Sequence, residues 1–176
     1  MTISDVPDER STVNYPLSDA GDVMETGRLL EEIGAQYHGV AADIRQRVGM
    51  DRLAAETIAT FGQIDIVVAN AAICGFSSFE ELTDAQWCEM IDTNLTGTFH
   101  TVQAVVRHMR ERQYGRIIVI SSMSGRSGNR NLAHYVASKF GVIGMVKSIA
   151  LELATTGITA NVVCPSTTST PMIHND

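Results

Sequence analysis

Short apolar runs alternate with longer segments of helical periodicity along most of the chain. The run Ile64-Asp-Ile-Val-Val-Ala69 is rich in β-branched residues, which is typical of a strand buried on both faces of a parallel sheet. Similar runs predict three further strands, at residues 37–42, 116–121 and 158–163. The longer periodic segments predict helices at residues 20–33, 46–61, 84–113 and 133–155. This alternation predicts parallel strands joined by right-handed helical crossovers, an α/β fold.

Four glycines follow the predicted helices, where a left-handed cap residue is common: Gly34, Gly62, Gly115 and Gly157. Residues 4–19 are polar and contain two prolines, so we expect a loop there. With 176 residues and no linker or internal repeat, the chain is expected to form one domain over residues 1–176.

Composition narrows the possible partners and surroundings. The net charge of −7 disfavours nucleic acid as the main partner. The longest apolar stretch, residues 66–76, is shorter than the roughly 20 residues of a membrane span, and the acidic, polar amino terminus is unlike a signal peptide. The three cysteines are far apart and lack metal-ligand spacing, so no metal and a reducing cytoplasm are expected.

Candidate chemistry gathers in residues 121–139. Tyr135 and Lys139 are four apart on a predicted helix and share a face, and Ser122 follows a predicted strand at the sheet edge where α/β folds bind ligands. A phenol needs a nearby cation to act as an acid or base near neutral pH, and Lys139 can be that cation. The alternative is a half-buried helix with a core tyrosine and a solvated lysine, since such pairs are common.

The spacing of Ser122, Tyr135 and Lys139 resembles the active-site signature of the short-chain dehydrogenase/reductase family. Asn70-Ala71-Ala72 is similar to the family's Asn-Ala-Gly motif, with alanine in place of glycine. Asn94 resembles the family's helix asparagine, and Cys164 to Thr170 resembles its Pro-Gly segment, although Ser166 replaces the glycine. The resemblance covers nearly the whole chain and implies a Rossmann-like, doubly wound parallel sheet.

The resemblance implies a role for each matched residue. Ser122 would orient the substrate, and Tyr135 would act as acid/base. Lys139 would lower the pKa of Tyr135 and bind ribose, and Asn94 would support a proton-relay water. Ser122 could instead cap its loop, and Asn94 could face solvent. Cofactor contacts are implied for Asp5, Asp43, Ile44, Asn70, Ala71, Tyr135, Lys139, Pro165, Thr168 and Thr170. By this resemblance Asp5 ends the second strand of the family's fold and favours NAD over NADP.

Several segments, Tyr15-Pro-Leu and Ala133-His-Tyr135 among them, resemble the carveol dehydrogenase-like, mycofactocin-coupled branch. That branch has an insertion matching residues 4–19. It implies tightly held NAD, an alcohol or ketone substrate, an external redox acceptor and a homo-oligomer.

Two regions of the family have no counterpart in this sequence. We expect the family's first strand, with its glycine-rich turn for the pyrophosphate, to precede Thr2, and its substrate region to follow Asp176. The first strand is central in the Rossmann order, so the remaining strands are expected to flank a gap. Two interpretations stay open: an NAD(H)-dependent oxidoreductase of alcohols and ketones, or a non-catalytic fragment or pseudoenzyme that serves as a binding or oligomerisation partner.

Overall fold

The computed structural model describes residues 1–5, 12–13, 15–170 and 172, in which strands and helices alternate. The strands are β1 (Thr2–Asp5), β2 (His38–Ala41), β3 (Ile66–Ala69), β4 (Gly115–Ile120) and β5 (Ile158–Val163). The helices are α1 (Ala20–Glu32), α2 (Arg47–Phe61), α3 (Asp84–Ile91), the π-helical η1 (Asp92–Gly97), α4 (Thr98–Arg112), the 3-10 turn η2 (Met123–Gly125) and α5 (Ala133–Glu152). The expected α/β architecture is therefore confirmed.

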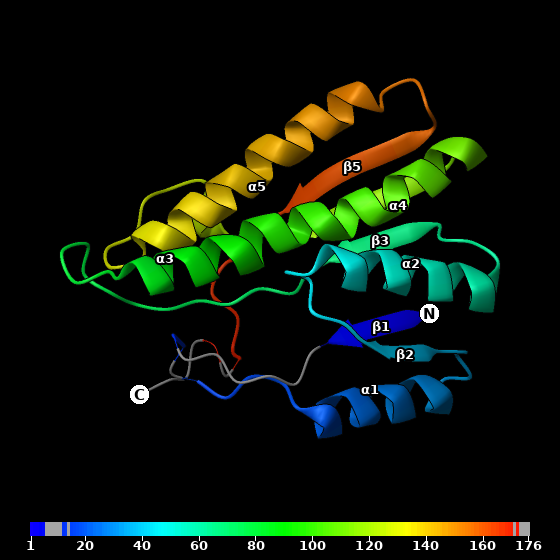
Figure 1. Cartoon of the computed structure of the whole chain (residues 1–176), viewed down its shortest axis with the longest axis horizontal. Coiled ribbons are helices and arrows are strands. Elements are labelled where there is room, and N and C mark those ends of the chain that lie inside the picture. The colour runs from blue at the N-terminus through cyan, green and yellow to red at the C-terminus, as the bar shows by residue number, and fades with distance from the viewer. Residues whose placement is uncertain (6–11, 14, 171, 173–176) are drawn as a thin grey trace.

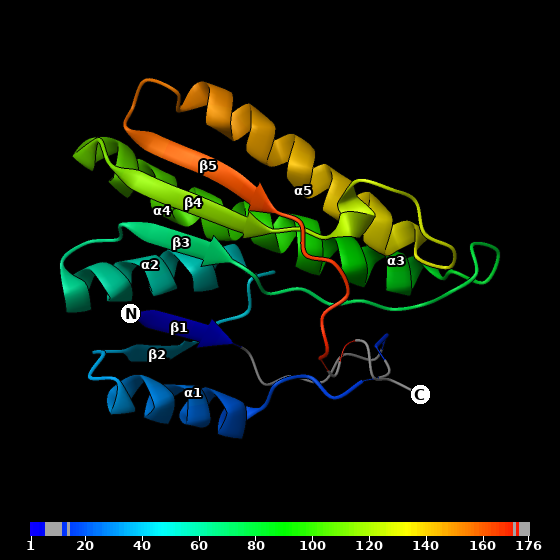
Figure 2. The ribbon, with the colours of Figure 1, turned by 180° about the vertical axis from the view of Figure 1, so that it is seen from behind.

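All strand pairs are parallel, and they form two sheets. β1 pairs with β2, whereas β3, β4 and β5 pair in that order. The carboxyl ends of the strands point the same way, so the segments that follow them meet along one edge (Figure 2). Among the described residues β1 and β3 are not paired with each other, in agreement with strands that flank a central position.

The sheet of β3, β4 and β5 is covered on one face by helices. α4 and α5 lie in front of it in Figure 1, and Ile117 and Val119 of β4 are fully buried beneath them. The opposite face, turned toward the viewer in Figure 2, includes Ile66 and Val68 of β3, which are 58% and 55% exposed. One face of this sheet thus holds the main core, and the other presents apolar side chains to solvent.

Two of the four predicted glycine caps, Gly34 and Gly62, are confirmed. Gly157 is also left-handed, but α5 ends at Glu152 and is capped by Leu153. Gly34, Gly62 and Gly157 have φ values of 73°, 81° and 69°, the left-handed region that favours glycine. The prediction for Gly115 is wrong, because Gln113 takes the left-handed conformation after α4 and Gly115 opens β4. Packing accounts for this glycine, since a Cβ there would lie 2.4 Å from the sulfur of Met109.

Two further differences from the expected elements bear on the site. The predicted helix at 84–113 is divided by the π-helical turn η1, which contains Asn94. The expected loop at 4–19 begins after β1 and ends at Asp19, whose carboxylate accepts the Gly21 and Asp22 N–H groups and caps α1. Its residues 6–11 and 14 lie outside the described part of the chain.

Candidate active site

The segments after β4 and β5 lie against each other at the common sheet edge. The Ser121 N–H donates to the Val163 carbonyl at 2.8 Å, and the Met123 N–H donates to the Pro165 carbonyl at 3.0 Å. Ser122, between these two residues, is half-buried, and its hydroxyl accepts the Ser124 N–H at 3.1 Å. Ser122 therefore caps the turn η2, which agrees with the alternative that it caps its loop. It also lies at the edge of the candidate site.

α5 brings Tyr135 and Lys139 to the same place. Lys139 is only 3% exposed, and its Nζ donates to the Ile120 carbonyl at 3.1 Å. The same Nζ lies 5.6 Å from the centroid of the Tyr135 ring. The Ser121 hydroxyl donates to the Lys139 carbonyl at 3.1 Å and so ties the end of β4 to this turn of α5. The helix is thereby fixed with both side chains at the strand ends.

Burial sets the protonation of this pair. It raises the pKa of the Tyr135 phenol, and the nearby Ser122 hydroxyl opposes that rise. Burial also lowers the pKa of the Lys139 ammonium to about 8. Ser122 therefore favours the Tyr135 phenolate, and the effect of Lys139 on the Tyr135 pKa stays a prediction. At pH 7 the phenol is neutral and the lysine still carries most of its charge.

Asn94 is buried, at 1% exposure, in the π-helical turn. Its Oδ1 accepts the Ile73 N–H and its Nδ2 donates to the Ile73 carbonyl, both at 2.8 Å, and Nδ2 also lies 3.2 Å from the Ser138 Oγ. The Asn94 carbonyl accepts the Thr98 hydroxyl at 2.7 Å. The solvent-facing alternative is therefore wrong. The amide links the segment after β3 to α5.

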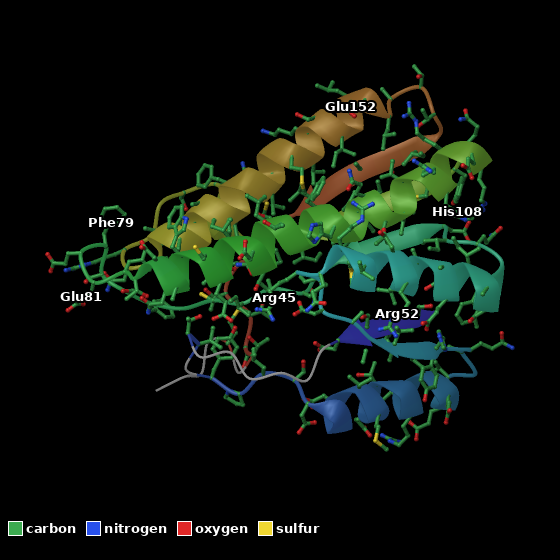
Figure 3. The ribbon with its side chains drawn as sticks, in the orientation of Figure 1. Arg45, Arg52, Phe79, Glu81, His108 and Glu152 are labelled. Carbon is green, nitrogen blue, oxygen red and sulfur yellow. The ribbon has the colours of Figure 1, made fainter. Side chains whose placement is uncertain are left out.

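Two predicted cofactor residues lie where β1 and β2 end. Asp5 is the last residue of β1, and its carboxylate accepts the Ser18 hydroxyl. Asp43 follows β2 and accepts the Arg45 backbone N–H at 2.9 Å and its guanidinium at 2.6 Å. Figure 3 shows Arg45 close to α3, where its guanidinium lies 3.7 Å from the Glu89 carboxylate. An open hollow of about 350 Å³ is lined by Asp43, Arg45, Gln46, Asp92 and Thr96.

The remaining predicted cofactor residues have different surroundings. Ile44 packs on the end of η1, because a Cβ at Gly97 would lie 2.7 Å from its side chain. Asn70 and Ala71 follow β3 and are exposed at the sheet edge. Thr168 and Thr170 are exposed, and their hydroxyls donate to the Ser166 and Thr168 carbonyls of the same segment. These contacts do not bring them to Tyr135.

Two further residues beside the site, Tyr15 and His134, were not singled out as functional from the sequence. Tyr15 is 8% exposed, and its hydroxyl accepts the Cys74 N–H at 3.1 Å. His134 is 2% exposed, burial lowers its pKa, and its Nδ1 has no partner among the described atoms. The polar loop and the position of His134 on a predicted helix gave no signal of this burial.

The site residues fit part of a dinucleotide. Exposed Asn70 and Ala71 follow β3. Asp5 ends β1 and Asp43 follows β2 at the same edge, which suits ribose and adenine groups. No strand-to-helix loop in this sequence contains the expected cluster of glycines, so no residue is assigned to the pyrophosphate. In the described residues, no group of three or more metal-ligating side chains is placed to hold a metal ion, and no helix is long and apolar enough to cross a membrane.

Comparisons with known proteins agree with this architecture. (−)-trans-Carveol dehydrogenase of Rhodococcus erythropolis is 35% identical over 178 residues, which cover 100% of this chain and 64% of that enzyme. An uncharacterized NAD-dependent oxidoreductase of Mycobacterium tuberculosis is 39% identical over 164 residues, covering 93% of this chain and 60% of that protein. The crystal structure of carveol dehydrogenase from Mycobacterium avium in complex with NAD has a TM-score of 0.96 at 33% identity. That match covers 99% of this chain and 64% of the Mycobacterium avium chain.

The chain thus spans less than two thirds of the length of these relatives. The short chain dehydrogenase family model matches residues 17–176, which include Asn94, Ser122, Tyr135 and Lys139. With parallel strands whose ends bring these side chains together, the chain belongs to the short-chain dehydrogenase family.

Proposed function

We propose that the protein is an oxidoreductase that interconverts a secondary alcohol and a ketone with NAD(H). The observation that carries this proposal is the convergence of Ser122, Tyr135 and the buried Lys139 at the carboxyl edge of the strands. A neutral phenol beside a serine hydroxyl and a buried ammonium can exchange a proton with an alcohol oxygen. The similarity to carveol dehydrogenases supports the same chemistry.

Each residue has a separate task in the proposed reaction. The Ser122 hydroxyl donates a hydrogen bond to the substrate oxygen and fixes its position. Tyr135 gives its phenolic proton to that oxygen during ketone reduction and takes it back during alcohol oxidation. The Lys139 charge, held in place by the Ile120 carbonyl, stabilises the negative charge that develops on the Tyr135 oxygen. NAD(H), when bound, supplies or accepts the hydride.

Asn94 acts one step away from this proton transfer. Its amide is occupied by Ile73 and Ser138, so we assign it to holding the segment after β3 beside α5. Support for a relay water is proposed for this residue on the family resemblance alone.

The proposed cofactor contacts follow the same edge. Asp5 would bind the adenosine ribose, Asp43 and Ile44 the adenine, and Asn70 and Ala71 a ribose. Tyr135 and Lys139 would bind the nicotinamide ribose, and Pro165, Thr168 and Thr170 the carboxamide. Similarity to the Mycobacterium avium enzyme, whose structure is in complex with NAD, supports NAD as the cofactor.

Further proposals concern the surroundings of the reaction. Apolar side chains are exposed on α4 and α5, with Phe99 40%, Phe140 46% and Leu151 80% exposed, which supports a homo-oligomer. Tightly held NAD and an external, mycofactocin-type redox acceptor are proposed on the sequence resemblance to that branch alone. The unpaired cysteines support a cytoplasmic location.

Tyr135→Phe tests the function, because it keeps the ring and removes the proton donor. In protein with a complete cofactor site, we expect kcat for alcohol-dependent NAD reduction to fall by about 100-fold or more while NADH binding is retained. Tyr114→Phe, at the opposite end of β4, is the matched control. Near-normal turnover of Tyr135→Phe would refute the assignment. Absence of both NADH binding and turnover in the wild type would favour the non-catalytic alternative.

A further inference from the structure

The segment from Ile73 to Gly75 is held by side chains from distant parts of the chain. Asn94 pairs with both backbone groups of Ile73. The Tyr15 hydroxyl accepts the N–H of the next residue, Cys74, at 3.1 Å. Two consecutive backbone N–H groups are therefore fixed by two buried side chains.

Gly75 completes this contact with the segment around Tyr15. A Cβ at Gly75 would lie 3.4 Å from the Thr12 carbonyl oxygen and 3.7 Å from the His134 Nε2. Residues 12 and 15, which follow β1 in the sequence, thus pack against a segment about 60 residues further along the chain. Periodicity in the sequence cannot show such a contact.

Tyr15 is suited to act as a permanent hydrogen-bond acceptor in this position. Its side chain is buried, and burial raises the pKa of its phenol to about 12. The hydroxyl therefore stays neutral at pH 7 and well above it.

Cys74 connects Tyr15 to the proposed chemistry. Its thiol is buried, and its neighbours lie against the turn of α5 that carries Tyr135. A Cβ at Gly75 would lie 3.7 Å from the His134 Nε2. Asn94, which binds Ile73, also contacts Ser138, whose hydroxyl donates to the Tyr135 carbonyl at 2.7 Å. Burial raises the pKa of the Cys74 thiol to about 11, so the thiol lines the site in its uncharged form and is not a nucleophile. Movement of the Cys74 backbone would therefore change the surroundings of Tyr135.

We propose that Tyr15 is a positioning residue that, through the Cys74 N–H, holds residues 73–75 as a wall of the Tyr135 site. The segment after β1 thereby controls the shape of the region in which the substrate oxygen meets the phenol. The kinetic consequence rests on the proposed function, whereas the structural anchoring does not.

Tyr15→Phe isolates the hydroxyl, since the ring stays in place. Amide hydrogen exchange measured on the whole chain should speed up roughly three- to tenfold in residues 73–75, which corresponds to one lost hydrogen bond, and stay unchanged in β4. Tyr114→Phe, in which an exposed tyrosine loses its hydroxyl, should leave both regions unchanged.

A second readout reports on Tyr135 without requiring activity. The chain contains four tyrosines, so a ¹³Cζ-tyrosine label gives four signals, and Tyr135→Phe identifies the signal of interest. Tyr15→Phe should shift the Tyr135 signal, whereas Tyr114→Phe should not.

Kinetics add a third readout if the proposed function holds. Tyr15→Phe should raise KM for the alcohol roughly three- to tenfold without changing the amount of NADH bound per chain. A simple loss of folded protein would instead lower kcat and the bound NADH together.

The outcomes separate the two proposals. Unchanged exchange at residues 73–75 would overturn the anchoring, and faster exchange with an unmoved Tyr135 signal would overturn the positioning role. A wild-type protein without turnover would refute the proposed function, while exchange and the Tyr135 signal would still decide the role of Tyr15.

Discussion

The side chain of Asn94 binds the backbone of Ile73 through two hydrogen bonds of 2.8 Å, as a neighbouring strand would. Both residues are buried, at 1% and 3% exposure, so water cannot replace either bond. The π-helical turn places the amide here, and π-helical turns are frequent at functional sites. The backbone groups of Ile73, in the segment beside Tyr135, thus depend on one side chain for their hydrogen bonds.

Asn94→Ala should destabilise the protein by roughly 3 kcal/mol, because it leaves the Ile73 N–H and carbonyl buried without partners. Urea denaturation measures this loss as a lower free energy of unfolding. Asn161→Ala, which truncates an exposed asparagine on β5, should change that free energy by less than about 0.5 kcal/mol. Equal losses in the two variants would contradict the importance of the Ile73 pair.

Lys139→Met should alter how stability depends on pH. The folded-state pKa of about 8 lies below the ordinary value of 10.5, so between these values the unfolded chain binds more protons than the folded one. Wild-type stability should therefore carry the full cost of the buried charge below pH 8. It should regain up to roughly 3 kcal/mol as the pH rises toward 10.5.

The measurable quantity is the difference in the free energy of unfolding between Lys139→Met and wild type, followed from pH 7 to 10. As the pH rises, the free energy of unfolding of the wild type should increase relative to that of Lys139→Met, because only the wild type loses a buried charge. The lost bond to the Ile120 carbonyl adds a constant offset. Lys147→Met removes an exposed lysine of the same helix and should give a flat difference, and a flat curve for Lys139→Met would refute the prediction.

Local chemistry in the sequence predicted much of the framework. The β-branched runs became strands, and Gly34, Gly62 and Gly157 take the left-handed conformation because the backbone there requires it. Gly115 was misplaced since its role is close packing on Met109, a contact that helix-end rules do not contain. Helical periodicity continues through residues 92–97, so the π-helical turn left no visible break.

The site was predicted to a similar extent. Family resemblance selected the residues that lie together at Ser122, Tyr135 and Lys139, although their roles remain predictions. The burial of Tyr15 was not foreseen, because it depends on a hydrogen bond to Cys74 across 59 positions of the chain. Asp43 was assigned to adenine, whereas the structure also shows its carboxylate bound by Arg45, a contact that spacing alone did not indicate.

Asp5 should set the choice between NAD and NADP. A carboxylate at the end of β1 accepts hydrogen bonds from a ribose 2′-hydroxyl and repels a 2′-phosphate. In protein with a complete cofactor site, Asp5→Asn should shift the ratio of kcat/KM for NAD over NADP by about tenfold toward NADP. Asp51→Asn removes an equal charge from an exposed position on α2 and should leave the ratio unchanged. Equal use of both cofactors by the wild type would show that Asp5 has another role.

Residues 1–176 expressed alone should associate with themselves and bind NADH weakly. β3 is hydrogen-bonded to β4, and among the described strands no other pairs with it, so its second edge can template pairing with another chain. Ile66 and Val68 of this strand are exposed and add an apolar surface beside that edge. Weak binding is expected because the sequence has no glycine-rich turn for the pyrophosphate.

Sedimentation at several concentrations, combined with NADH fluorescence titration, tests both halves of this prediction. Val68→Lys places a charge on the exposed strand and should shift the distribution toward monomer, since lysines on edge strands oppose pairing. Val48→Lys, at a 79% exposed position on α2, adds the same charge away from the sheet and should leave association unchanged. A monodisperse monomer that binds NADH with micromolar affinity would contradict the prediction, because it would require the β3 edge and the pyrophosphate site to be satisfied within this chain.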